Sequence, residues 1–201
     1  MHVFYRSFII VLLAIGFLNT PSFASSEPSE MFITSVTSEA LDILKNAKNP
    51  EEREAAFGRL LDTRTNMKRI AKFTLGRSAR TISDDEFNRF QSVLGDTMVK
   101  IYANRLAGFT DEKVVVTGSQ TKGRNHLVTS RVEFANSRPP VDMVWWVIEE
   151  KDGSFALFDI QVLGVWMAQE QRDIFSGILK SNNNKINALI EHLAAQVKTT
   201  P

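Results

Sequence analysis

The hydrophobic period of this chain changes twice, and no other feature of the sequence constrains the fold as strongly. From Met31 to Leu106, apolar residues recur every three or four positions, as they do on one face of a helix. Between Lys113 and Leu163 the period becomes two, and Val, Ile, Thr, Phe and Trp are frequent, which is typical of β-strands. The helical period returns after Met167. Because helices and strands are segregated along the chain, the pattern predicts an α+β fold with about six helices packed on a curved antiparallel sheet.

Capping residues mark the starts of two helices. Asn49-Pro50, followed by acidic residues, predicts one start, and the capping box Ser83-Asp84-Asp85-Glu86 predicts the start of the longest helix. The expected helices are Met31–Ala47, one that begins at Pro50, Asn66–Leu75, one from Ser83 to Leu106, Met167–Leu179 and Lys185–Val197.

The segment of period two divides into four expected strands, which are Lys113–Thr121, Asn125–Ala135, Val141–Glu150 and Ser154–Leu163. The connections between them are short, and short connections suit antiparallel neighbours. We therefore expect a four-stranded antiparallel meander.

The centre of this sheet is apolar on both faces. In the third strand, alternation puts Val141, Met143, Trp145 and Val147 on one side and Val144, Trp146 and Ile148 on the other. In the fourth strand it puts Phe155 and Leu157 on one side and Ala156, Phe158, Ile160 and Val162 on the other. Two interpretations follow. Either helices cover both faces and close the core, or one face lines a pocket for an apolar ligand.

The first 24 residues are typical of a signal peptide. Arg6 precedes the apolar run Phe8–Leu18, and Ser22 and Ala24 occupy the −3 and −1 positions of a small-residue cleavage pattern. The run has 11 residues, fewer than the roughly 20 of a transmembrane helix. We expect cleavage after Ala24 and a single exported domain over residues 25–201, with a retained N-terminal anchor as the alternative.

Composition excludes several classes of function. The chain has no Cys, which rules out thiol chemistry, Cys-ligated metals and a disulfide framework. It has 24 basic and 23 acidic residues without a basic cluster, unlike a nucleic-acid-binding protein. His126 and His192 have no partner at a metal-ligand spacing, so neither a metal nor a cofactor is expected.

One pair of residues could support catalysis. Asp159 lies in an otherwise apolar strand and Tyr102 lies on the longest helix, and a buried Asp beside a Tyr is suited to proton transfer on an apolar substrate. A satisfied structural hydrogen bond is the alternative for Asp159, and it is the interpretation that we favour.

Four stretches, taken in order, resemble one known family. They are Ile70–Arg77, Phe87 to Ala103, Asn136–Val141 with Trp145 and Trp146, and Asp159 to Met167 followed by Phe175. With these stretches the chain resembles the MlaC-type phospholipid-binding proteins, also called the toluene-tolerance family, including the branch of the hopanoid locus. The resemblance covers nearly the whole chain after the signal segment.

The resemblance implies a monomeric periplasmic carrier that is not an enzyme. Such proteins hold the two acyl chains of a phospholipid in a hydrophobic pocket between sheet and helices. They shuttle the lipid between an inner-membrane ABC-type lipid transporter complex and an outer-membrane lipoprotein complex, which maintains outer-membrane lipid asymmetry. The resemblance thus favours an enclosed apolar pocket over a closed core.

The expected lipid-binding residues are Phe73, Leu75, Ile101, Tyr102, Val144, Trp146, Phe158, Ile160 and Trp166. The segment Leu163-Gly164-Val165-Trp166 departs from the usual Glu-Gly-Val-Ser of the family, so a hopanoid or sterol-like cargo stays open. The other alternative is a small α+β isomerase or hydratase that acts on an apolar substrate through Asp159 and Tyr102.

Overall fold

The structure is a computed structural model, and it describes residues 27–136 and 138–199. The expected signal segment, residues 1–24, lies outside the described residues. Within the described ranges, no helix combines the length and the apolar character needed to cross a membrane.

Six α-helices form, as expected, together with one 3₁₀ turn. They are α1 (Pro28–Asn46), α2 (Pro50–Arg64), α3 (Met67–Leu75), η1 (Gly76–Arg80), α4 (Asp84–Arg105), α5 (Met167–Ser181) and α6 (Ile186–Thr199). The two predicted caps are present. Asn49 Oδ1 accepts from the N–H of Glu52 at 2.8 Å, and Ser83 and Glu86 form a reciprocal capping box.

The sheet is antiparallel, but it has five strands and not the four expected from the sequence. They are β1 (Lys113–Lys122), β2 (Asn125–Glu133), β3 (Val141–Glu149), β4 (Phe155–Val162) and β5 (Val165–Trp166), in the order β1-β2-β3-β4-β5. The fifth strand arises because Leu163 and Gly164 both have positive φ angles, +50° and +84°, which folds the chain back on β4. A strand of two residues is too short to show a period.

A bulge in β4 overturns the expected alternation of its side chains. Trp146 pairs with Asp159 and Val147 pairs with Leu157, so Phe158 is an extra residue between the two pairs. Ile160 pairs with Trp145 and therefore lies on the same face as Leu157, opposite to Phe158. The prediction that Ile160 and Val162 share a face with Phe158 was wrong for this reason.

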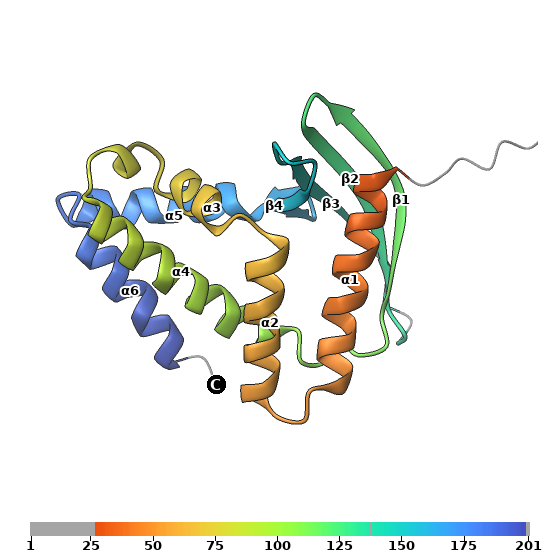
Figure 1. The fold of residues 1–201 in the computed structure, drawn as a ribbon. Helices are drawn as coiled ribbons and strands as arrows, with labels where there is room; N and C mark the ends of the chain where they lie inside the picture. Colours follow the sequence, from red (N-terminus) through yellow and green to blue (C-terminus); the bar gives the residue numbers. More distant parts are fainter. Residues whose placement is uncertain (1–26, 137, 200–201) are drawn as a thin grey trace, which may run out of the picture.

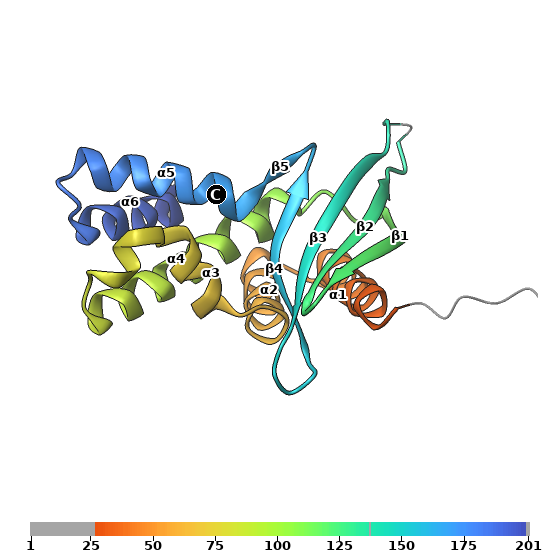
Figure 2. The same cartoon turned by 90° about the horizontal axis from the view of Figure 1, so that it is seen from above.

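Helices contact the sheet in two regions. Helix α1 lies against β1 and β2, whereas α3, α4, α5 and α6 form a bundle beside the sheet, beyond β4 (Figures 1 and 2). Helix α2 lies between these two parts and contacts α1, α4 and β4.

Buried apolar side chains form three groups with no buried member in common. The bundle group includes Phe90 and Phe175, whose rings meet edge to face at 5.9 Å. The sheet group comprises Ile33, Val128, Trp145, Val147 and Leu157. The hairpin group comprises Leu44, Phe57, Leu60 and Ala103, from α1, α2 and α4.

Candidate functional site

The sheet face toward α1, here called the α1 face, is apolar across four strands. Its side chains are Val114 and Val116 of β1, Val128 of β2, Met143, Trp145 and Val147 of β3, and Leu157 and Ile160 of β4. Ser130 and His126 are buried polar residues on this face. The Oγ of Ser130 accepts a hydrogen bond from Trp145 Nε1 at 2.8 Å, and Nδ1 of His126 lies 2.9 Å from Thr121 Oγ1. The pairing of Ser130 with Trp145 satisfies both of these groups inside an otherwise apolar face.

Several apolar side chains on this face and on the helices are only half-buried. On the sheet these include Val114, Val116, Met143 and Ile160, which pack around the buried sheet group. On the helices they include Leu41, Val99, Leu106 and Phe109, which pack around the hairpin group. Interiors are normally close-packed, so half-buried apolar walls are where a further apolar group can be accommodated.

The sheet and the helices meet at two places at the margins of these walls. The Phe109 ring, after α4, lies 6.1 Å from the Phe134 ring, after β2. At the end of α2, Thr65 forms an isolated parallel bridge with Leu157 of β4. These contacts tie the helical wall to the sheet.

Four of the nine expected lipid-binding residues form an aromatic chain on the opposite face of the sheet. The ring of Phe158 lies 5.2 Å from Phe73 and 4.9 Å from Trp146, and Trp146 lies 5.9 Å from Trp166. The guanidinium of Arg172 lies 5.1 Å from the centre of the Phe73 ring. The structure thus brings Phe73, Trp146, Phe158 and Trp166 together, and Val144 shares this side of β3.

The other expected residues are dispersed. Leu75 is buried in the bundle core, Ile101 and Tyr102 are half-buried on α4, and Ile160 lies on the α1 face. The nine residues therefore do not line one surface. The alternation rule alone could not place Ile160, because the bulge at Phe158 depends on pairing between strands.

Asp159 has a structural role. Its carboxylate Oδ1 accepts from the backbone N–H of Ile160 and of Ala168, both at 2.8 Å. Ala168 lies in the first turn of α5, where Trp166, the N-cap residue, makes no side-chain cap. Asp159 therefore caps this helix from β4. Its hydrogen bonds are structural and satisfied, as the favoured interpretation predicted.

Burial shifts the pKa values of both Asp159 and Tyr102. Burial raises the pKa of Asp159 above its ordinary value, although the backbone N–H groups of Ala168 and Ile160 oppose the shift. Burial also raises the pKa of Tyr102; the charges of Asp159 and Glu170 add to this effect and Arg105 opposes it.

Two hollows open on the surface between helices. One, of about 520 Å³, lies between α1 and α2 and is lined by polar residues such as Ser35, Glu39 and Arg59. The other, of about 650 Å³, lies between α5 and α6 and includes Ile174 and Gly177. None of the nine expected lipid-binding residues lines either hollow.

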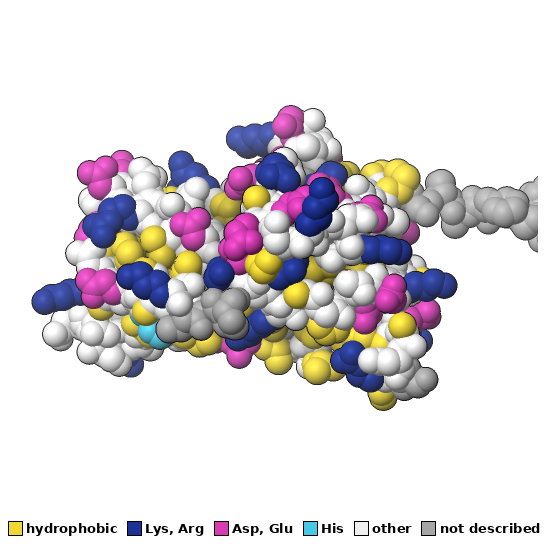
Figure 3. Space-filling view, turned by 90° about the horizontal axis from the view of Figure 1, so that it is seen from below, with side chains coloured by type: hydrophobic (Ala, Val, Ile, Leu, Met, Phe, Trp, Pro, Cys, Tyr) yellow, Lys and Arg dark blue, Asp and Glu magenta, His cyan; other side chains and the backbone are white. Residues whose placement is uncertain are grey.

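Neither the charges on the face drawn in Figure 3 nor the metal-binding groups of the described residues define a site. On the face drawn in Figure 3, basic and acidic side chains are interspersed. Across residues 27–136 and 138–199, no group of three or more His, Asp or Glu side chains is placed to hold a metal ion.

Comparison with known proteins gives one consistent result. The family model described as MlaC protein matches residues 34–195. The Haemophilus influenzae intermembrane phospholipid transport system binding protein MlaC is 24% identical over 128 residues, which is 62% of this chain and 59% of that protein. The match thus spans less than two thirds of the curated relative.

A solved structure shows the same fold. It is a phospholipid-binding protein from Ralstonia solanacearum in complex with a phospholipid, and it superposes with a TM-score of 0.75 at 17% sequence identity. The superposition covers 85% of this chain and 97% of the Ralstonia chain.

Proposed function

Because this chain belongs to the MlaC family, whose model matches residues 34–195, we propose that it is a phospholipid carrier. The acyl chains would lie between the α1 face of the sheet and the wall formed by α1, α2 and α4. The observation that carries this proposal is that half-buried apolar side chains occur both on the α1 face, such as Met143 and Ile160, and on the helices, such as Leu41 and Leu106. The Ralstonia protein of the same fold is described in complex with a phospholipid, which supports the choice of ligand.

Carriage requires burial and release but no bond making. Each methylene removed from water contributes about 0.8 kcal/mol, so two acyl chains provide a large driving force for binding. Asp159, the one acidic residue considered for catalysis, already binds the backbone of α5. The protein is therefore proposed to act without a catalytic centre and without a cofactor.

The proposed place of action is the periplasm, with lipid passed between an inner-membrane ABC-type transporter complex and an outer-membrane lipoprotein complex. Two observations support it. Residues 1–24 have the pattern of a cleaved signal peptide, and the Haemophilus relative is named as a binding protein of an intermembrane phospholipid transport system.

Native mass spectrometry of the protein, purified from the periplasm without detergent, tests the proposal. The expected spectrum contains a one-to-one adduct of phospholipid mass that disappears on denaturation. An adduct of hopanoid or sterol mass would keep the carrier function and correct the cargo. A spectrum of bare polypeptide, even after incubation with phospholipid vesicles, would contradict carriage.

A further inference from the structure

Helices α1 and α2 are held together differently at their two ends. They are joined by the short connection at Ala47–Asn49 (Figure 1), and Leu44, close to this connection, packs in one apolar group with Phe57 and Leu60 of α2. At the other end of α2, Arg64 makes polar contacts with α1. A groove of about 520 Å³ lies between the two helices, and Ser35 and Glu39 are among the residues that line it.

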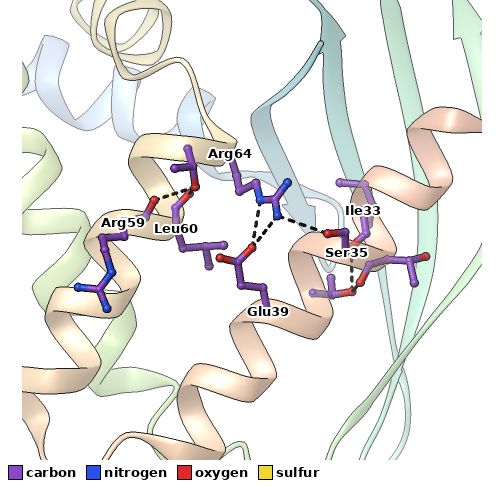
Figure 4. Close-up of polar contacts among 9 residues, drawn as sticks. Ile33, Ser35, Glu39, Arg59, Leu60 and Arg64 are labelled. Atoms are coloured by element: carbon purple, nitrogen blue, oxygen red, sulfur yellow. Dashed lines mark hydrogen bonds and ion pairs between the residues drawn. The ribbon is translucent and has the colours of Figure 1, made fainter.

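The polar contact is made by Arg64, the last residue of α2. Its Nη2 lies 2.8 Å and its Nε lies 3.1 Å from Glu39 Oε2, and Nη2 also donates to Ser35 Oγ at 3.4 Å (Figure 4). The side chains of Arg64 and Glu39 are 33% and 41% exposed. An ion pair with this exposure contributes little to stability and is weakened by salt, so it can open without unfolding the protein.

The two helices joined by this ion pair are anchored on different strands. Helix α1 is fixed to β1, where Ser119 Oγ donates to Glu30 Oε1 at 2.7 Å. The end of α2 is fixed to β4 through the bridge between Thr65 and Leu157. Strands β2 and β3 lie between these anchors, and they carry Val128, Trp145 and Val147 of the α1 face.

We propose that the gap between α1 and α2 is the portal by which an acyl chain reaches the α1 face, and that the Arg64–Glu39 ion pair is its latch. The proposal rests on the proposed carrier function and names the route to the same site. Opening the latch lets the end of α2 move away from α1 about the connection of the two helices, while Leu44, next to that connection, keeps its apolar contacts. The latch thus controls the rate of exchange more than the affinity.

A cross-link across the gap tests this portal. The chain has no Cys, so the pair Glu39→Cys and Arg64→Cys provides the only thiols. A bismaleimide with a cleavable disulfide in its spacer then joins α1 to α2 reversibly. The probe is a phosphatidylethanolamine with a pyrene-labelled acyl chain, and its release into acceptor vesicles is followed by fluorescence.

The matched control uses another ion pair of α2. Lys100 Nζ lies 2.9 Å from Glu54 Oε1 and joins α4 to α2, so it does not span the gap. The pair Glu54→Cys and Lys100→Cys is cross-linked with the same reagent. A second control is the first pair capped with N-ethylmaleimide, which removes the ion pair without joining the helices.

We expect the protein cross-linked between positions 39 and 64 to retain preloaded probe until the spacer is reduced, while the protein cross-linked between positions 54 and 100 releases it at the ordinary rate. In the uncross-linked protein, Arg64→Gln should speed release about two- to fivefold. Equal release from both cross-linked proteins would overturn the portal and leave the carrier function standing. If the unmodified protein takes up no probe at all, both proposals fail.

Discussion

The carboxylate of Asp159 accepts a hydrogen bond from the backbone N–H of Ala168 at 2.8 Å, which ties β4 to the first turn of α5. The same oxygen accepts from the N–H of Ile160. A buried carboxylate at a helix N-terminus satisfies donors that the helix itself leaves unpaired.

Removing this carboxylate should cost stability but not lipid binding. Asp159→Ala leaves buried N–H groups unpaired, which costs about 1–3 kcal/mol of the free energy of unfolding, whereas Asp159→Asn keeps one acceptor oxygen and costs less. Urea denaturation measures both. Lipid occupancy of the Asn variant, read by native mass spectrometry, should equal that of the wild type. Loss of a turnover reaction in Asp159→Asn, with occupancy unchanged, would instead support the isomerase alternative.

Asp159 should also make stability depend on pH. Its pKa is raised by burial from an ordinary value of 3.8, so between these two pKa values the folded chain binds more protons than the unfolded chain. The contribution of Asp159 to the free energy of unfolding is therefore largest at acid pH and falls as pH rises through the raised pKa. The wild type should lose stability relative to Asp159→Asn over this interval. A relative gain with rising pH would contradict the burial of this carboxyl.

Substitutions on the two sides of β3 should identify the face that binds lipid. Met143→Lys puts a charge on the half-buried α1 face. Burying that charge against acyl chains is unfavourable, so the substitution should weaken lipid binding by about tenfold or more. Val144→Lys places the same charge on the opposite face and should leave binding nearly unchanged.

The control is Val115→Lys, because this side chain is on β1 and is 43% exposed. Binding is measured by displacement of a pyrene-labelled phospholipid, and thermal unfolding verifies that all three variants fold. Loss of binding in Val144→Lys but not in Met143→Lys would move the lipid to the side of the aromatic chain.

Local signals predicted most of the fold. The caps at Asn49 and Ser83 act within one helical turn, so the helix starts could be inferred from short stretches of sequence. The first helix begins three residues earlier than expected, at Pro28, which suits a first helical position.

Features that depend on pairing between strands could not be predicted in the same way. The bulge at Phe158 is visible only when β4 is aligned with β3, and it decides on which face Ile160 lies. Trp145 and Trp146 are equivalent in the sequence, since both faces of β3 are apolar. Alternation therefore could not decide between them. Trp146 is among the candidate residues named from the sequence and Trp145, which lies on the α1 face, is not.

Leu163 occupies a left-handed backbone conformation that is more favourable for Asn. Its φ angle is +50° and its side chain is 78% exposed, so the unfavourable backbone is offset by little burial. Leu163→Asn would create Asn-Gly, a sequence preferred in two-residue hairpin turns, and should raise the free energy of unfolding by about 0.5–1 kcal/mol. Thermal unfolding measures this change. The control Val165→Asn, in β5, should destabilise, and destabilisation by both variants would show that the Leu163 side chain has a packing role.

Ser130 should contribute more to stability and to lipid binding than its small side chain indicates. It accepts the indole N–H of Trp145 at 2.8 Å inside the sheet group, so Ser130→Ala leaves a buried donor unpaired and should cost about 1–3 kcal/mol of unfolding free energy. Asn125→Ala is the matched control, because Asn125 accepts the indole N–H of Trp146 at 2.9 Å in an exposed position, and its loss should cost about 0.5 kcal/mol or less. Urea denaturation compares the two. The bond to Ser130 satisfies the indole N–H, the polar group of the Trp145 side chain. Its loss would leave an unpaired donor on the α1 face, so lipid occupancy of Ser130→Ala should fall while that of Asn125→Ala does not. If Ser130→Ala and Asn125→Ala lose equal unfolding free energy and keep equal lipid occupancy, the proposal that lipid binds on the α1 face is contradicted.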